Sequence, residues 1–204
     1  IEAFTGFNDN NPVTSFANAP EATLYGLELE SQKYFFLSDM TERAFFASRR
    51  LVLIGNYTWS KSEISVKDGD TTDVFGTVTQ PASNFFRDGA PLTGQSEHLV
   101  NLQIGLEDED ALSQQTLLIS YASDRVTSRG AAGLPDIYES PGISVDFVAR
   151  QGFQFLGKGM EFKFEARNLL GREYSEYQER GPNRIYFNRY DRGVKFSASI
   201  SASF

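Results

Sequence analysis

The sequence predicts an all-β fold in which antiparallel strands run up and down, as in a transmembrane β-barrel. Three observations predict it. Apolar and polar residues alternate with a period of two along most of the 204 residues. The connections between the alternating segments are by turns long and short. Many segments also have at least the ~9–11 residues that a tilted strand needs to cross a bilayer.

The alternation divides the chain into eight strands. We expect them over residues 1–7, 21–37, 46–66, 94–107, 112–124, 141–153, 160–170 and 189–204. In the second strand, TLYGLELES sets an apolar face against a polar one: Tyr25, Leu27 and Leu29 against Gly26, Glu28 and Glu30. In the third, LVLIGNYTWS is apolar on both faces before Tyr57 and Trp59 oppose Asn56 and Thr58. Between these strands, TERAFFASRR (residues 41–50) allows a helical turn.

The later strands repeat the pattern. LVNLQIGL, ISVDFVAR and MEFKFEARN each place apolar residues at every second position, with Val148 as the exception. The final segment, GVKFSASISASF, alternates apolar residues with Lys195 and four serines and ends on Phe204. No segment shows a comparable 3.6-residue period, so the sequence favours strands over helices throughout.

The connections alternate in length as the strands do. Long ones cover residues 8–20, 67–93, 125–140 and 171–188, and they collect Asn, Asp, Gly and Pro. Short ones hold SDMTERAF, DEDA and FLGKG. Up-and-down strands put alternate connections at opposite ends, and transmembrane barrels have short periplasmic turns and longer extracellular loops. Because the strand count is even, both ends of the chain would lie on the periplasmic side.

Composition excludes several classes of function. The net charge of −8 argues against a nucleic-acid binder, and the absence of cysteine excludes disulfides and thiol chemistry. A single histidine, His98, makes a His-based metal site or a Ser-His-Asp triad hard to build. We expect no enzyme and no cofactor. The start lacks a signal peptide and suggests a chain cut from something longer, and no apolar run approaches the ~18 residues of a spanning helix.

A soluble β-sandwich remains as an alternative, because it too alternates apolar and polar residues. In a sandwich the apolar face meets a second sheet, whereas in a membrane barrel it meets lipid. Strand length and the sorting of loops by end favour the barrel.

Five segments resemble, in order, the C-terminal barrel of TonB-dependent outer-membrane receptors. They are NAPEATLYGLELE, LIGNYTWSKSEI, PLTGQSEHLVNLQIGLE, FEARNLLGREY and YDRGVKFSASISASF. The third departs from the family pattern at Ser96, where proline is common. The resemblance implies about eight C-terminal strands of a 22-stranded barrel, over residues 1–204, with the plug domain and earlier strands absent.

The resemblance also implies a function. Such receptors sit in the outer membrane of Gram-negative bacteria and take up a scarce nutrient, here most directly a ferric siderophore, otherwise a saccharide, cobalamin or another small ligand. Their partners are outer-membrane lipid, TonB through the N-terminal plug, the small-molecule ligand and the barrel-assembly machinery. Phe204 would be the signal that this machinery reads, or an interface aromatic. A self-contained eight-stranded barrel, adhesive or structural, is the other membrane alternative.

Two sets of candidate residues follow. Aromatic and arginine side chains in the long connections could hold an anionic iron chelate or stack on a sugar: Phe85, Phe86, Arg87, Tyr177, Arg180, Arg184, Tyr186 and Phe187. Charged residues on the polar strand faces would face the lumen: Glu28, Glu30, Asp146, Arg150, Glu161, Lys163, Glu165 and Arg167. The same residues also fit a simpler interpretation, as loop cores and as the solvated face of amphipathic strands.

Overall fold

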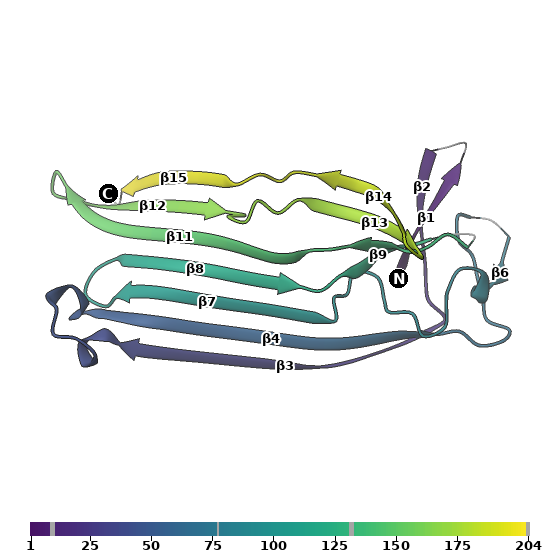
Figure 1. The fold of residues 1–204 in the computed structure, drawn as a ribbon, viewed down its shortest axis with the longest axis horizontal. Coiled ribbons are helices and arrows are strands. Elements are labelled where there is room, and N and C mark those ends of the chain that lie inside the picture. Colours follow the sequence, from purple (N-terminus) through teal and green to yellow (C-terminus); the bar gives the residue numbers. More distant parts are fainter. Residues whose placement is uncertain (9–10, 77, 131–132, 203–204) are drawn as a thin grey trace.

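The computed structural model describes residues 1–8, 11–76, 78–130 and 133–202, and in this part the chain is all-β (Figure 1). Seven strands form what we call the main sheet, in the order β15-β12-β11-β8-β7-β4-β3. Their bounds are β3 (Glu21–Phe36), β4 (Arg49–Ser65), β7 (His98–Asp108), β8 (Ser113–Ala122), β11 (Gly142–Phe155), β12 (Lys158–Arg167) and β15 (Lys195–Ala202). All neighbouring pairs in this sheet are antiparallel.

Six further strands form an end sheet, in the order β14-β13-β10-β9-β1-β2. Their bounds are β1 (Glu2–Asn8), β2 (Asn11–Ala17), β9 (Arg125–Gly130), β10 (Ile137–Glu139), β13 (Tyr174–Arg180) and β14 (Asn183–Tyr190). The long segment between β4 and β7 holds the short pair β5 (Thr71–Thr72) and β6 (Gln80–Pro81) and the 3₁₀ turn η3 (Ala82–Asn84). The β3–β4 connection holds the 3₁₀ turns η1 (Leu37–Asp39) and η2 (Ala44–Phe46).

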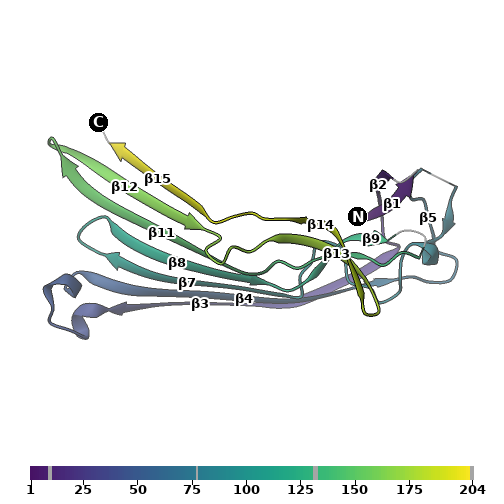
Figure 2. The same cartoon turned by 45° about the horizontal axis from the view of Figure 1, so that its top comes forward.

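Four strands of the end sheet continue the main sheet lengthwise. β8 leads into β9, β10 into β11, β12 into β13 and β14 into β15, so that the hairpins extend beyond the main sheet (Figures 1 and 2). Both views show the main sheet as a single curved layer. The short turns gather at its other end.

The break between the two sheets is built around Asn168 and Arg172. Asn168 has a left-handed φ of 55°, which Asn adopts more readily than most residues. Its amide donates to the carbonyls of Arg172 and Gly193 and accepts the Arg172 N–H. The Arg172 guanidinium donates to the carbonyls of Ser140 and Pro141 and occupies the space where Gly142 would carry a Cβ. Any larger residue at position 142 would displace the arginine and loosen this junction.

The structure corrects the expected connections. Residues 125–140 and 171–188 are strand hairpins with short tips rather than long loops, and residues 8–20 contain β2. The predicted final strand, 189–204, is β15 together with the end of β14, and Phe204 lies outside the described residues. Gly133 and Pro135, and likewise Gly181 and Pro182, lie between paired strands, whereas the flanking residues complete their hydrogen bonds with neighbouring strands.

The first strand has an unexpected partner. Residues 1–7 do form a strand, but β1 pairs with β2 and, in parallel, with β9 instead of lying beside β3. The up-and-down order therefore holds for the seven strands of the main sheet and not for β1. Within the described residues the main sheet does not close into a barrel, since β3 and β15 are its two opposite edges.

Buried charges hold β1 in this place. The Arg129 guanidinium on β9 donates to Glu2 at 3.0 and 2.8 Å and to Asp136 at 3.0 Å, and it also donates to the Pro91 carbonyl. Glu2 in turn accepts the Thr93 N–H at 3.1 and 3.2 Å. The Arg129 and Glu2 side chains are each only 2% exposed. We call Glu2, Arg129 and Asp136 the buried ion cluster.

A small hydrophobic core adjoins this cluster. Its buried members are Phe4, Ala17, Ile64, Val74, Ala82 and Phe86. The Phe4 ring meets Phe86 edge-on at 5.1 Å and Phe85 at 6.0 Å. The compact core therefore lies at the end of the molecule that carries the long connections, and the main sheet extends away from it as a single layer (Figure 1).

Candidate functional site

One face of the main sheet is largely apolar. Because the strands pair in register, every second residue joins a row that crosses the sheet. One such row runs through successive cross-strand partners: Leu53, Ile104, Leu117, Phe147, Ala166 and Phe196. Two residues along the strands lies a parallel row: Leu51, Leu106, Gln115, Ala149, Phe164 and Ala198. We call this surface the apolar band.

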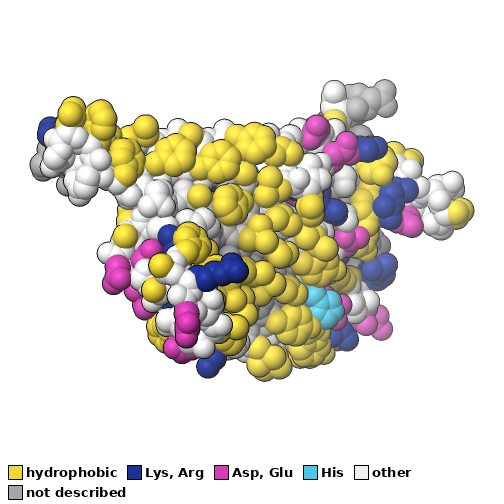
Figure 3. Space-filling view, turned by 60° about the vertical axis from the view of Figure 1, so that its left-hand side comes forward, with side chains coloured by type: hydrophobic (Ala, Val, Ile, Leu, Met, Phe, Trp, Pro, Cys, Tyr) yellow, Lys and Arg dark blue, Asp and Glu magenta, His cyan; other side chains and the backbone are white. Residues whose placement is uncertain are grey.

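The apolar band is not covered by any described part of the chain. Leu27 and Leu29 on β3 are each 54% exposed, and Phe196 and Ile200 on β15 are 66% and 62% exposed. Figure 3 shows a broad continuous apolar surface, with His98 at its side. Soluble monomers rarely expose apolar patches beyond a few hundred Å². The face lacks the second layer that a β-sandwich would place over it.

The apolar band crosses the strands diagonally. Its margin toward the end sheet begins at Tyr25 on β3 and at Phe196 on β15. Cross-strand pairing connects Phe196 on β15 to Lys33 on β3. Between β15 and β3 the margin is therefore displaced along the strands by 33 − 25 = 8 residues. Eight residues are ~27 Å along a strand, and six strand-to-strand steps are ~29 Å.

This slope gives the orientation of the strands relative to the apolar band. The margin is displaced by ~27 Å along the strands over a distance of ~29 Å across the sheet. The strands are therefore tilted by ~40° from the normal to the band. Strands of transmembrane barrels tilt by ~35–45° from the membrane normal. The apolar surface therefore has the obliquity that such a barrel requires.

Aromatic side chains with polar tips line the margin of the apolar band next to the end sheet. The Tyr25 and Trp59 rings meet edge-on at 5.8 Å, and Trp59 Nε1 donates to Glu97 at 3.3 Å. Tyr57 and His98 stack at 6.1 Å, and Tyr57 Oη lies 2.9 Å from His98 Nδ1. Such side chains suit a boundary between apolar and aqueous surroundings, where the ring is buried and the tip is hydrated.

The eight residues predicted to face the lumen all lie on the opposite face of the main sheet. The register places Glu28 and Glu30 on one strand face with Asn56, and carries that face across to Asp146 and Arg150. Arg150 in turn lies opposite Lys163, whose strand places Glu161, Glu165 and Arg167 on the same side. The polar pattern of the sequence thus corresponds to one continuous surface.

Most of the charges on this polar face neutralise one another. Arg150 pairs with Glu161 at 2.7 Å, Lys163 with Glu165 at 2.5 Å, and Arg167 with Glu165 at 3.3 Å and Asp146 at 4.0 Å. These six side chains carry three charges of each sign. Each pair, being partly exposed, is worth ~0–1 kcal/mol. Glu28 accepts a hydrogen bond from Asn56. With Glu28 and Glu30 the eight residues carry five negative and three positive charges, and every positive charge among them is paired.

The first group of predicted ligand residues lies partly in the core. Phe86 is buried and Phe85 half-buried, and both pack against Phe4. Arg87 is exposed. All three line a cavity of about 250 Å³ between residues 83–87 on one side and residues 129–130 and 133–136 on the other. Of this group, only Arg87 presents its side chain freely to a ligand.

The second group lies on β13 and β14 rather than in a loop. Tyr177 is buried, and its ring lies between the stacked Tyr138 ring, 6.0 Å away, and the Arg184 guanidinium, 3.9 Å away. Its hydroxyl donates to Asp124 at 2.9 Å, and burial raises the pKa of Tyr177 to about 12. Arg184 also pairs with Glu179. Tyr177 and Arg184 therefore hold the hairpin together.

The rest of this group remains exposed on the same hairpin: Arg180, Tyr186 and Phe187. The two groups lie on different elements: the first follows η3 outside the end sheet, and the second lies on β13 and β14 within it. A hydrogen bond of 2.7 Å from Gln178 Nε2 to the Pro135 carbonyl connects the hairpin to the wall of the cavity. The structure thus places both groups at the same end of the molecule without joining them in one pocket.

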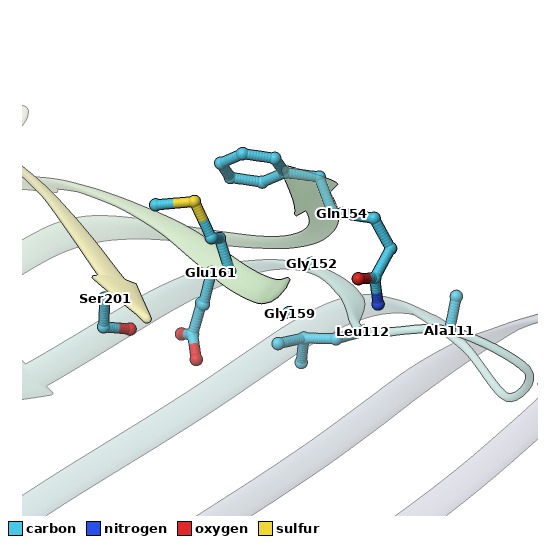
Figure 4. Close-up of a pocket in the computed structure, with 9 residues that line it drawn as sticks. Ala111, Leu112, Gly152, Gln154, Gly159, Glu161 and Ser201 are labelled. Atoms are coloured by element: carbon cyan, nitrogen blue, oxygen red, sulfur yellow. The ribbon is translucent and has the colours of Figure 1, made fainter. Parts of the chain in front are cut away.

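A second hollow, which the sequence did not predict, lies near the short turns (Figure 4). Its volume is about 530 Å³, and it is bordered by Ala111, Leu112, Gly152, Phe153, Gln154, Gly159, Met160, Glu161 and Ser201. Leu112 lies over Gly152, where a Cβ would approach the Leu112 Cβ to 2.9 Å. Glu161 is its one charged side chain, and it already pairs with Arg150. The hollow holds no group of residues suited to catalysis.

Further observations bear on the class of protein. In the described ranges, no three His, Asp or Glu side chains come together as metal ligands do. No helix in this part of the chain is long and apolar enough to span a membrane. Comparison with protein-family models, with curated proteins and with solved structures gives no match.

Proposed function

We propose that this chain forms part of the wall of an outer-membrane β-barrel and that the barrel serves the energy-coupled uptake of a scarce nutrient. One observation carries the membrane part of the proposal. The apolar band is exposed and extends over seven strands, which are tilted by ~40° from its normal, while the opposite face is polar and most of its charges are paired. Lipid on one side and lumen water on the other satisfy both faces.

The open edges of the main sheet favour a barrel larger than eight strands. The outer edges of β3 and β15 pair with no described strand. In hydrocarbon each unpaired backbone group costs several kcal/mol, so both edges need partners. A self-contained eight-stranded barrel would join β3 to β15, whereas here they stand at opposite edges. The proposal gives both edges to the other strands of a 22-stranded barrel, the number that the resemblance to TonB-dependent receptors implies.

The energetic coupling rests on the same resemblance. TonB would act through an N-terminal plug that these 204 residues do not include, and the barrel-assembly machinery would recognise the closing strand. At the end of the molecule that carries the end sheet, exposed cations and aromatic rings support an anionic chelate as ligand, and a ferric siderophore is the first candidate. These exposed residues are Arg87, Arg180, Tyr186 and Phe187.

Uptake by cells tests this function. Cells that carry the full-length protein as their sole uptake route should accumulate a radiolabelled anionic ferric chelate, and a protonophore should abolish accumulation. Arg87→Gln should weaken chelate binding by about 10- to 150-fold, because a charge-assisted contact is worth ~1.5–3 kcal/mol. The matched control is Lys158→Gln, an exposed cation among the short turns, which should bind as the parent does. If accumulation stays the same after addition of the protonophore and after deletion of the gene, the result would contradict the proposal.

A further inference from the structure

The β3–β4 turn, residues 37–48, differs from the other turns at its end of the main sheet. The β7–β8 turn holds four residues and the β11–β12 turn two, whereas this one holds two 3₁₀ turns and several apolar side chains. Met40 is 73% exposed and Phe45 56% exposed. Phe45 meets Phe46 edge-on at 4.9 Å, so the aromatic rings form a small cluster rather than single exposed residues.

The β3–β4 turn places apolar side chains beyond an ion pair that borders the apolar band at the end with the short turns. Arg49 shares a strand face with Leu51 and Leu53, so it lies on the side of the apolar band, and it pairs with Asp108 at 3.4 Å. The Phe45 ring lies over the Arg49 guanidinium at 4.0 Å. Both charged side chains are largely covered, at 14% and 12% exposure. The Phe45 ring thus covers the ion pair next to the apolar band, and the rest of the Phe45 side chain remains exposed.

The charges of the turn are arranged for a dipolar partner. Arg43 is exposed, as are Asp39 and Glu42, and none of the three takes part in an ion pair among the residues that the structure describes. One cation beside two carboxylates complements a headgroup that carries both a phosphate and an ammonium. It would repel a surface that is purely anionic.

We propose that residues 37–48 are an anchor that inserts into the headgroup layer of zwitterionic phospholipid. Phe45 and Met40 lie at the level where acyl chains begin, Arg43 contacts phosphate, and Asp39 and Glu42 contact ammonium groups. Aromatic residues gather at this level of a membrane because their rings leave water while their edges stay near polar groups. The inference rests on the proposed membrane position of the apolar band.

Spin labels can test the depth of this turn, since the chain contributes no cysteine of its own. Labels would be placed through Phe45→Cys, through Phe164→Cys in the apolar band, and through Asp68→Cys in the exposed segment at the opposite end. The full-length protein would be reconstituted in phosphatidylethanolamine vesicles. The ratio of collisions with oxygen to collisions with a nickel chelate rises with depth in lipid.

The expected order of the ratio is Phe164 highest, Phe45 intermediate and severalfold above Asp68. A Phe45 label that behaves as the Asp68 label does, beside a deep Phe164 label, would overturn the anchor alone. Equal values at all three positions would instead contradict the membrane position of the apolar band.

Lipid composition tests the headgroup chemistry. When phosphatidylglycerol replaces phosphatidylethanolamine, the ratio at Phe45 should fall, because the two carboxylates are repelled. The double variant Asp39→Asn/Glu42→Gln should remove that fall. A ratio that rises in phosphatidylglycerol, or that does not respond to lipid in either protein, would overturn the assignment to zwitterionic headgroups.

Discussion

Phe164→Arg should lower the free energy of unfolding in lipid vesicles by about 2–4 kcal/mol, the cost of an arginine near mid-bilayer on the proposed lipid face. Phe164 lies in the interior of the apolar band on β12, between Phe162 and Ala166 on the same face. Its ring stacks on Phe196 of β15 at 6.3 Å. The arginine would lose that contact and place a charge where the account puts acyl chains.

Glu165→Gln is the matched control, one residue further along the same strand and on the opposite face. Its carboxylate pairs with Lys163 and Arg167 in partly exposed positions, so its loss should cost ~0–1 kcal/mol. Urea unfolding of the full-length protein from lipid vesicles measures both. Equal tolerance of the two substitutions would mean that the faces have been assigned wrongly.

Arg129→Met should detach the first hairpin from the end sheet. It removes the cation from the buried ion cluster and leaves the Glu2 carboxylate almost fully enclosed, with the Thr93 N–H still donating to it. Breaking a buried pair by removing one partner costs roughly 3–5 kcal/mol. Amide exchange in residues 2–8 and 11–17 should accelerate, while exchange in the main sheet stays as in the parent.

The double variant Glu2→Gln/Arg129→Met provides the control. Without either charge, the hairpin should recover part of its protection, because an uncharged amide costs far less to bury than an unpaired carboxylate. Unchanged exchange in the single variant would show that the small core around Phe4 and Phe86 alone holds the hairpin. Exchange that accelerates equally over the whole chain would show that the cluster supports the main sheet as well.

The main sheet could be predicted from the sequence because the two-residue alternation of apolar and polar side chains along a strand does not depend on which strand pairs with it. The alternation in TLYGLELES fixes which side chains share a face, and pairing with the next strand only aligns them. The structure accordingly places Leu27 opposite Trp59, and Glu28 opposite Thr58. The polar face of the eight charged residues followed from the same rule.

The position of β1 could not be predicted in this way. EAFTGFN is rich enough in apolar residues for a strand, but its place beside β9 depends on a contact between Glu2 and Arg129, which lie 127 residues apart. Neither residue stands out in the sequence. A buried arginine and a solvated one look alike until the fold encloses one of them.

The β13–β14 hairpin shows why loop and strand were confused. Its residues are charged and aromatic in both alternating sets, so no face emerges as apolar, and RGPN in the middle suggests a loop. The strands form because their backbones pair from Tyr174–Tyr190 to Arg180–Asn183. Tyr177 and Arg184 consequently stack on each other, a structural use of side chains that the sequence suggested for a ligand.

The exposure of the apolar band gives these separate observations a common basis. The aromatic margin at Trp59, the covered ion pair at Arg49 and the paired charges of the polar face would each be unremarkable in a soluble protein. Together with an uncovered apolar surface they define two boundaries and an interior. The proposed membrane position therefore depends on whether that surface meets lipid or water.

Cysteine accessibility along β7 in native membranes tests this point most directly. Single cysteines would replace each residue from Val100 to Leu106 in the full-length protein, and a water-soluble maleimide would label those that face water. We expect labelling at 101 and 103 and protection at 100, 102, 104 and 106. Position 105 should also be protected, because a side chain there would be enclosed by the buried Val52 and Thr116 on the polar face. Labelling of the second set as readily as the first would contradict a lipid-facing band.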